Sequence, residues 1–211
     1  MNADRVAASY RWLEYAAFGS ALEEARFDFL PRASTARRVL ILGEGDGRFL
    51  ARLLGINRQA SIVVVETSSK MLRLAKRRVP PSARSRVEFH QIDATAQPLP
   101  AGEFDLAVSH FFLDVFDCPQ ASAVISKVNA LLSPGAVWLV SEFQQPPSFL
   151  RGLHARVWLR AMYAFFALTT GLRATQLPPY RDLLTRNGFT EMEHRERRFG
   201  LIRSQVWRKA P

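Results

Sequence analysis

Only one of the 211 residues is a cysteine, Cys118, and this scarcity excludes an internal disulfide framework. With one cysteine and four dispersed histidines, the chain also lacks the clustered ligands of a zinc site, and we expect no bound metal. The best candidate for an apolar span, residues 161–172, contains two threonines and falls short of the roughly 18 residues that cross a bilayer. Charges interrupt the first 20 residues, which do not resemble a secretory signal. We therefore expect a cytoplasmic protein, at most peripheral to the inner face of a membrane.

Two common catalytic motifs are also missing from the sequence. It contains no Gly-Lys-Ser/Thr sequence, which a P-loop needs to hold phosphates, and no G-x-S-x-G nucleophile motif. These absences argue against P-loop nucleotide hydrolysis and against the chemistry of a serine hydrolase.

Positive charge, by contrast, is abundant and uneven. The formal net charge is +10, and 25 of the 29 basic residues are arginines. Residues 1–150 carry a net +2, from 17 basic and 15 acidic side chains, whereas residues 151–211 carry +8, from 12 basic and 4 acidic ones. Such an asymmetry is expected of a protein that meets nucleic acid or an anionic membrane, and equally of an arginine-rich surface that faces only water. The charge alone leaves both interpretations open.

Apolar runs and helical patterns alternate along the chain from residue 38 onward. Short runs rich in β-branched residues predict buried strands, and most of the segments between them carry apolar residues at helical spacing. Strands are expected at 38–42, 61–65, 87–92, 104–109 and 136–140, with helices at 48–56, 68–79 and 119–132. Strands that alternate with helices form a mostly parallel sheet that is covered on both faces.

The two ends of the chain depart from this alternation. Residues 1–37 are amphipathic at helical spacing, with a break at Pro31, whereas residues 189–207 predict an antiparallel hairpin that extends the sheet. The fold class is therefore α/β, Rossmann-like and doubly wound, with seven strands. We expect one domain, made of a helical cap (1–37), a ligand-binding core (38–147) and substrate-side helices with the terminal hairpin (148–211).

The first expected strand ends in a glycine-rich loop. Gly43, Gly45 and Gly47 alternate with Glu44 and Asp46, and this spacing lets the backbone turn tightly and approach a ligand closely. A dinucleotide fingerprint would need a further glycine at position 48, where this chain has arginine. A nicotinamide or flavin site is therefore disfavoured.

Carboxylates follow the next two strands. Glu66 ends the second strand, 19 residues after Gly47, and a carboxylate there can accept hydrogen bonds from both hydroxyls of a ribose. Asp93 follows the third strand and is an acceptor suited to an exocyclic amine. Because the carboxyl ends of parallel strands meet at one edge of a sheet, the three features are expected to line a single nucleoside site.

These residues give the chain a family resemblance. Over about residues 35–145 it is similar to a class I S-adenosylmethionine-dependent methyltransferase. Residues Val39–Gly47 resemble the first motif of that family, Val64–Leu72 the segment that carries the ribose-binding acid, and Phe104–Val108 its fourth strand. The resemblance implies that S-adenosylmethionine is the cofactor.

The resemblance also implies roles for individual residues. The three glycines would line the methionine and ribose part of the cofactor, and Glu66 would bind the ribose hydroxyls. Met71 or Thr67 would flank the adenine, while Asp93 with Ala94 would hold its amine end. Ser109 and His110 would lie near the sulfonium.

The sequence departs from the family pattern at one position. Many members have an acidic residue two positions before the first glycine, where this chain has Ile41. Glu44 would then supply the negative charge near the ammonium group of the cofactor, unless water or backbone carbonyls meet that charge.

Three further side chains are candidates for the catalytic chemistry. A base is needed only if the methyl acceptor must lose a proton. His110 could deprotonate a phenol with Asp114 as its orienting partner, or it could pack beneath the cofactor without any proton transfer. Glu142 begins a Glu-Phe-x-x-Pro sequence that resembles a segment of the ubiquinone/menaquinone methyltransferases. It is a candidate for the site or for bonds to nearby backbone.

The expected acceptor follows from the segment after the fifth strand. Residues 148–172 are apolar, aromatic and basic, which suits a small apolar or aromatic substrate or contact with an anionic membrane. The same residues are also typical of a helix that covers the core. We expect O- or C-methylation of a small molecule, with a nucleic-acid methyltransferase and a non-catalytic cofactor-binding module as alternatives.

Overall fold

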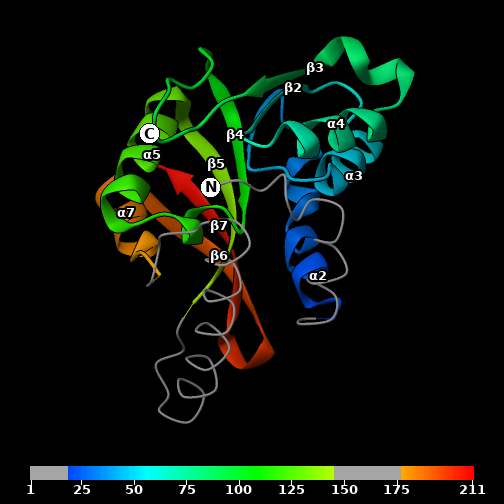
Figure 1. Ribbon diagram of the computed structural model, residues 1–211. Helices are drawn as coiled ribbons and strands as arrows, with labels where there is room; N and C mark the ends of the chain where they lie inside the picture. Colours follow the sequence, from blue (N-terminus) through cyan, green and yellow to red (C-terminus); the bar gives the residue numbers. More distant parts are fainter. Residues whose placement is uncertain (1–18, 145–176) are drawn as a thin grey trace.

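The computed structural model describes residues 19–144 and 177–211 (Figure 1). In these residues seven strands form one sheet, in the order β3-β2-β1-β4-β5-β7-β6. The strands are β1 (Arg38–Leu42), β2 (Ser61–Glu66), β3 (Val87–Gln91), β4 (Phe104–His110), β5 (Leu132–Phe143), β6 (Phe189–Arg197) and β7 (Ile202–Lys209). The helices are α2 (Ala21–Phe27), α3 (Arg48–Ile56), α4 (Ser69–Arg78), α5 (Cys118–Leu131) and α7 (Tyr180–Arg186). The short 3-10 helices are η2 (Leu30–Ala33), η3 (Pro81–Arg86), η4 (Leu113–Val115) and η5 (Arg198–Gly200).

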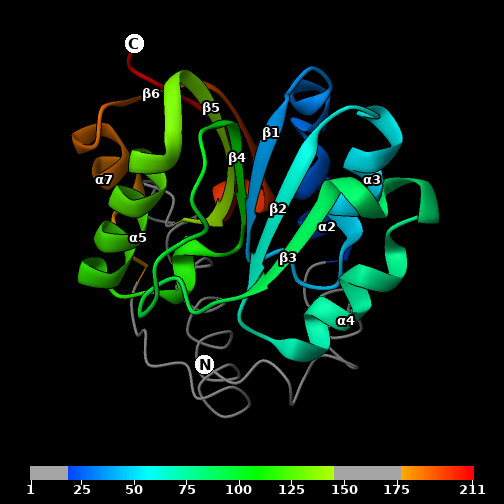
Figure 2. The same cartoon turned by 90° about the horizontal axis from the view of Figure 1, so that it is seen from above.

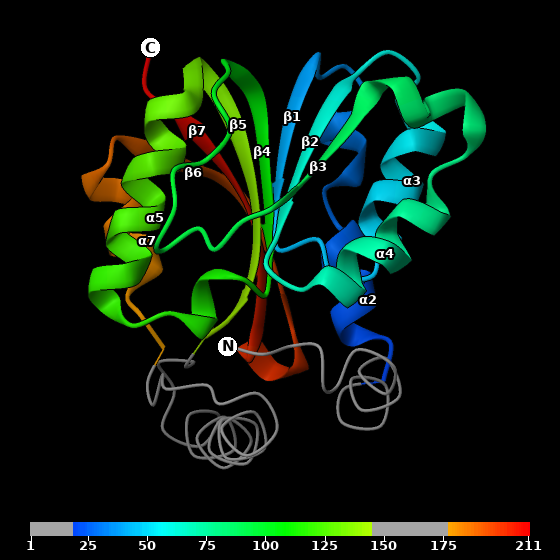
Figure 3. The same ribbon diagram turned by 45° about the horizontal axis from the view of Figure 1, so that its top comes forward.

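The sheet has the expected mixed topology. The first five strands are parallel to one another, while β7 is antiparallel to both β5 and β6. Helices α5 and α7 lie on one face of the sheet, and α2, α3 and α4 lie on the other (Figures 2 and 3). The Rossmann-like fold class with a terminal antiparallel hairpin is therefore confirmed.

The central strands are buried on both faces, which is why their sequences are continuous apolar runs. Four of the five residues of β1 and five of the six residues of β2 are buried. The helices carry their own start signals. The Ser68 hydroxyl accepts a hydrogen bond from the Met71 N–H at the start of α4, and Asp117 forms a reciprocal capping box with Gln120 at the start of α5.

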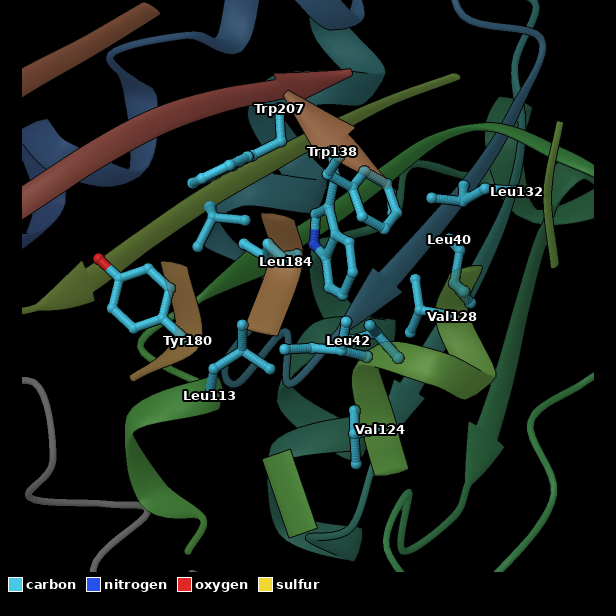
Figure 4. Close-up of a cluster of buried hydrophobic side chains, with 14 of the residues drawn as sticks. Leu40, Leu42, Leu113, Val124, Val128, Leu132, Trp138, Tyr180, Leu184 and Trp207 are labelled. Carbon is cyan, nitrogen blue, oxygen red and sulfur yellow. The ribbon is translucent and has the colours of Figure 1, made fainter. Parts of the chain in front are cut away.

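A hydrophobic cluster fills each side of the sheet. One cluster joins β1, β2, β4 and β5 to α5 and α7, and Figure 4 shows how Trp138 lies between Leu184, Leu42 and Trp207. The other cluster joins the opposite faces of these strands to α3 and α4. Trp138 is fully buried, and its indole N–H donates to the Ser109 hydroxyl at 3.0 Å, so that the one polar group of this side chain is satisfied within the core.

One of two local expectations needs correction. The helical segment is interrupted near the expected place, since α2 ends at Phe27 and Pro31 lies in the first turn of the separate η2, where a missing N–H costs nothing. Pro134–Gly135 was expected to separate α5 from a strand that begins at residue 136. Instead β5 begins at Leu132, which pairs with Phe104. The expected turn is a bulge within β5, where Gly135 has a positive φ of 74°. The expected cap over residues 1–18 lies outside the described residues, as does the segment from 148 to 172.

The arginines of the hairpin have partners within the fold. Arg197 contacts Glu24 at 2.8 Å and Asp28 at 2.6 Å, which ties β6 to α2. The Asp28 side chain is only 1% exposed, so these bonds compensate a buried carboxylate. Arg203 is likewise buried between Glu191 and Glu196. Much of the positive charge after residue 176 therefore stabilises the hairpin. No described helix has the length and apolar character needed to span a bilayer.

Candidate functional site

The candidate site lies where the strand order reverses, between β1 and β4. Ligands of open α/β sheets bind in the crevice outside the carboxyl ends of such strands. Leu42 pairs with Ser109, so the loop after β1 begins beside the end of β4. His110 in turn pairs with Ser141, which brings β5 to the same edge. The three strand ends are adjacent in Figure 3.

The glycine loop is held against β2 by two backbone donors. Gly43 N–H donates to the Val65 carbonyl at 2.8 Å, and Gly45 N–H donates to Glu66 Oε2 at 3.1 Å. Gly45 and Gly47 have different structural roles. A Cβ on Gly47 would lie 2.5 Å from the Ala75 Cα, so glycine is needed there for α3 to pack on α4. A Cβ on Gly45 would meet no described atom within 4 Å, which leaves the space beside this residue open.

Glu66 joins the glycine loop to the start of α4. Its second oxygen, Oε1, accepts from the Ser68 N–H at 2.9 Å, and its residue is 8% exposed. A carboxylate has about four acceptor positions, so it can accept ligand hydroxyls as well as these two N–H groups. Thr67 beside it is exposed, whereas Met71 is buried one turn into α4.

Asp93 organises the loop after β3. Its Oδ1 accepts from both the N–H and the hydroxyl of Thr95, at 2.9 and 2.6 Å, and the hydroxyl bond is the main reason that the pKa of Asp93 lies below its usual value. The neighbouring Ala94 has a buried side chain, and none of the described hydrogen bonds uses its N–H. The Asp93 carboxylate can accept a hydrogen bond from the amine of adenine, and the Ala94 N–H can donate one to the adjacent ring nitrogen.

The structure gives Glu44 a clear local role. Its Oε1 accepts from the Leu50 N–H at 2.9 Å, which satisfies a donor in the first turn of α3 that the helix-capping Gly47 cannot reach. Burial raises the pKa of Glu44 to about 8 despite this hydrogen bond. Ile41, at the position where relatives have an acid, is fully buried in the cluster beneath α3. With its pKa raised in this way, Glu44 is largely protonated near pH 7 and would have to lose that proton to supply the negative charge expected there.

Sequence reasoning missed an ionic clamp on the outer side of the glycine loop. Asp46 accepts from Arg48 Nε at 2.9 Å and from the Arg78 guanidinium at 2.9 Å, while Arg78 also donates to the Asp46 carbonyl. Arg78 ends α4, 32 residues away in sequence. The G-x-G-x-G spacing contains no signal for this long-range contact.

The end of β4 carries Ser109 and His110, which point to opposite faces of the sheet. Ser109 is fully buried against Trp138. His110 Nδ1 lies 2.9 Å from the Ser141 hydroxyl, which itself donates to the Ala25 carbonyl, so Nδ1 carries the proton. Burial, with a contribution from Arg26, lowers the pKa of His110 to about 3. His110 is therefore a neutral imidazole, and its ability to take a proton is weak.

Asp114 and Glu142 form a buried carboxyl pair beneath the loop that follows β4. Glu142 is fully buried and accepts from the N–H groups of Phe112, Leu113 and Asp114 at 2.9–3.2 Å. The two carboxyl groups also hydrogen-bond each other, which requires a proton on one of them. This pair holds the loop whose Phe112 ring packs against Gly43. It lies beneath the site and acts on the glycine loop through Phe112.

The donors and acceptors along this edge fit the expected cofactor. Glu66 can bind a diol, Asp93 with Ala94 presents an adenine-complementary edge, and the open space at Gly45 lies beside the same loop. Within residues 19–144 and 177–211, no three His, Cys, Asp or Glu side chains gather as metal ligands would.

The buried carboxyl pair predicts that the free energy of unfolding depends on pH. Burial raises the pKa of Asp114 to about 7 and, together with repulsion from Asp114, holds the pKa of Glu142 well above its usual range. In the unfolded chain both groups ionise near pH 4. Between pH 4 and the raised values, the folded protein therefore binds more protons, and its free energy of unfolding falls as pH rises. The lowered pKa of His110 acts in the opposite direction, but only below about pH 6.5.

We expect the substitution Asp114→Asn to flatten this dependence. Urea unfolding of the wild type at pH 6.5, 7.5 and 8.5 should show a falling free energy of unfolding, by up to about 1.4 kcal/mol per pH unit for each proton. The Asp114→Asn variant should show a smaller slope, and Glu103→Gln, at a position away from the pair, should keep the wild-type slope. Equal slopes in all three proteins would contradict the account of the pair.

Comparison with known proteins agrees with this site. The family described as "Methyltransferase domain" matches residues 39–135, from β1 to the turn in β5. The demethylmenaquinone methyltransferase of Thermus thermophilus is 32% identical over 149 residues, which are 70% of this chain and 64% of that protein. The magnesium-protoporphyrin O-methyltransferase of Rhodobacter capsulatus is 30% identical over 112 residues, 53% of this chain and 48% of that one. This chain thus spans less than two thirds of the length of either relative.

Solved structures show the same fold. The N-methyltransferase NodS from Bradyrhizobium japonicum, in complex with S-adenosyl-L-homocysteine, has a TM-score of 0.64 at 17% identity, and the match covers 90% of this chain and 88% of NodS. At that identity the likeness concerns the fold alone. With the family match over residues 39–135, which include the glycine loop, Glu66 and Asp93, it leads to one conclusion: this part of the chain is a methyltransferase domain of the class I, S-adenosylmethionine-dependent type.

Proposed function

We propose that this protein transfers the methyl group of S-adenosylmethionine to an oxygen or carbon atom of a small, apolar or aromatic acceptor. The observation that carries the proposal is the pre-arranged edge of the sheet, where Gly45, Glu66 and Asp93 are each fixed by hydrogen bonds at successive strand ends. Such fixed acceptors need little reorganisation when a ligand binds.

The cofactor would lie along this edge. In the proposed placement, Gly43, Gly45 and Gly47 line its methionine and ribose part, and Glu66 accepts the ribose hydroxyls. Asp93 and Ala94 bind the amine edge of the adenine, and Met71 or Thr67 packs against its ring. Ser109 and His110 lie towards the sulfonium. The cofactor supplies an electrophilic methyl carbon, so the protein has to provide position and a site that excludes water.

The surroundings of the glycine loop support an apolar acceptor. Phe111 and Phe112 follow β4, and their rings contact those of Phe143 and Phe116 at centroid distances of 5.2 and 5.0 Å. Phe111 adopts a positive φ of 54°, a strained conformation for a bulky residue, and such strain is often found at functional sites. Two of the proteins named above are called an O-methyltransferase and an N-methyltransferase, so their names leave the methylated atom open.

The chemistry of the candidate catalytic residues favours positioning over proton transfer. His110 stays neutral, and its weak basicity limits it to accepting a hydrogen bond. Asp114 and Glu142 hold the backbone of residues 112–114 and act on the site through that loop. An acceptor that needs no strong protein base, such as a phenolate or an electron-rich ring carbon, suits this arrangement best.

The nucleic-acid alternative has less support. Arginines of the terminal hairpin, such as Arg195 and Arg197, pair with Asp28 and Glu24 of the same chain instead of forming a stripe of unpaired cations. Arg181 and Arg203 pair with Glu191.

Turnover tests the proposed function directly. The purified protein, given S-adenosylmethionine labelled in the methyl group and a panel of phenols, catechols and naphthoquinols, should transfer label to at least one small product. A parallel reaction receives RNA and DNA. Label in nucleic acid would overturn the proposal in favour of the alternative, and tight cofactor binding without transfer to any acceptor would identify a binding module.

The substitution Gly45→Ala should weaken cofactor binding selectively. The added methyl enters the open space beside the loop, and overpacking by one methyl costs about 1–3 kcal/mol, so the Kd for S-adenosylhomocysteine should rise about 5- to 150-fold. Gly135→Ala is the matched control, because Gly135 has a similar φ of +74° and nothing within 4 Å among the described residues. Both variants should lose about 1–2 kcal/mol of stability from the strained backbone, but Gly135→Ala should leave the Kd unchanged. Equal Kd values for the two variants, measured by calorimetry, would contradict the placement of the cofactor.

A further inference from the structure

Lys127 of α5 makes a contact that the family resemblance did not suggest. Its ammonium group donates to the carbonyl oxygens of Ala94, Thr95 and Gln97, at 2.8, 3.2 and 3.0 Å. An ammonium has three N–H donors, so all three are used on one loop. The contact spans about thirty residues of sequence and joins α5 to the segment that follows β3.

This loop is the one that carries Asp93. From within, it is closed by bonds between Asp93 and its neighbours: the Asp93 N–H donates to Gln97 Oε1, and the Asp93 carbonyl accepts from the N–H groups of Ala96 and Gln97. These internal bonds set the shape of the turn. They do not fix where the turn lies relative to the sheet and the glycine loop.

Lys127 adds such a constraint, beside the bond from the Ile92 N–H to the Glu66 carbonyl and the packing of Ala94 in the core. Three carbonyl dipoles converge on one cation, and hydrogen bonds from a charged donor are stronger than those between neutral groups. Lys127 lies in α5 between Val124 and Val128, which are fully buried in the core. The ammonium therefore transfers the rigidity of the packed helix to a loop whose Asp93 is itself exposed.

We propose that Lys127 is a positioning residue for adenine recognition: by fixing the carbonyls of residues 94–97, it places the Asp93 carboxylate and the Ala94 N–H at the amine edge of the ring. The proposal rests on the proposed function, since it assumes that Asp93 faces the adenine. Loss of the cation would leave Asp93 chemically intact but variably placed.

A purely structural lysine is present for comparison. Lys209, at the end of β7, donates in the same way to the carbonyls of Asn129 and Leu132, at 2.8 and 2.6 Å. It ties the end of α5 to the sheet, and its bonds include none to the glycine loop, Glu66 or the Asp93 loop. Lys209→Met therefore removes a similar carbonyl clamp from the same fold without touching the site.

The experiment measures discrimination between two ligands that differ only at the adenine edge. S-Inosylhomocysteine carries an oxygen in place of the adenine amine of S-adenosylhomocysteine. Calorimetry gives the Kd of both ligands for the wild type, Lys127→Met and Lys209→Met. The wild type should prefer the adenosyl ligand by about 100-fold, because a fixed carboxylate rejects an oxygen.

The result of the experiment is read from the ratio of the two Kd values in each protein. Lys127→Met should reduce the preference to about tenfold or less, chiefly through weaker binding of the adenosyl ligand, while Lys209→Met keeps the wild-type ratio. If Lys127→Met does not fold, Lys127→Arg serves instead, since its planar donors cannot converge on three carbonyls, and an intermediate ratio is expected. An unchanged ratio in the Lys127 variants would overturn the proposal, whereas a wild type that binds neither ligand would overturn the proposed function itself.

Discussion

The carboxylate of Glu66 is the interaction on which the candidate site depends. One of its oxygens binds the Gly45 N–H of the loop after β1, and the other binds the Ser68 N–H at the start of α4. A single side chain thus fixes three segments that would otherwise move separately. Because it is mostly buried, these bonds are worth more than they would be in water, and the loop is held in shape before any ligand arrives.

The other constraints extend this scheme along the edge of the sheet. Asp46, bound by Arg48 and Arg78, fixes the outer side of the glycine loop, and the carboxyl pair of Asp114 and Glu142 fixes the loop after β4. Acidic side chains therefore hold the ligand edge of the sheet, while the hairpin at the far side of the sheet is held by ion pairs with α2. The large positive charge of the chain is in good part a feature of this second arrangement.

The fold could be predicted from the sequence because its signals are local. Continuous apolar runs such as Ile62–Val65 indicate strands buried on both faces, and the serines before α4 indicate a helix start. The order of Gly43, Glu66 and Asp93 at successive strand ends predicted the ligand edge. The sequence suggested Glu44 only as a substitute for the absent acid at position 41. It did not indicate the bond that Glu44 accepts from the Leu50 N–H at the start of α3.

Contacts between distant residues could not be predicted. The sequence left backbone bonds open for Glu142, but nothing in it indicates that their donors lie 28 to 30 residues away, or that Lys127 closes the loop after β3. The suggestion that His110 acts as a base came from its place at a strand end. Its low pKa depends on burial by Phe49 and the charge of Arg26, which only the folded structure brings together.

A crystal structure of the protein with S-adenosylhomocysteine tests the central claim most directly. The account predicts that both ribose hydroxyls lie within about 3 Å of the Glu66 carboxylate, as hydrogen bonds require, while Glu66 keeps its bond to the Gly45 N–H. The backbone of residues 43–47 and 93–97 should then superimpose on the present structure. A ribose bound elsewhere, or a glycine loop that releases Glu66 and refolds around the ligand, would contradict a site that is arranged in advance.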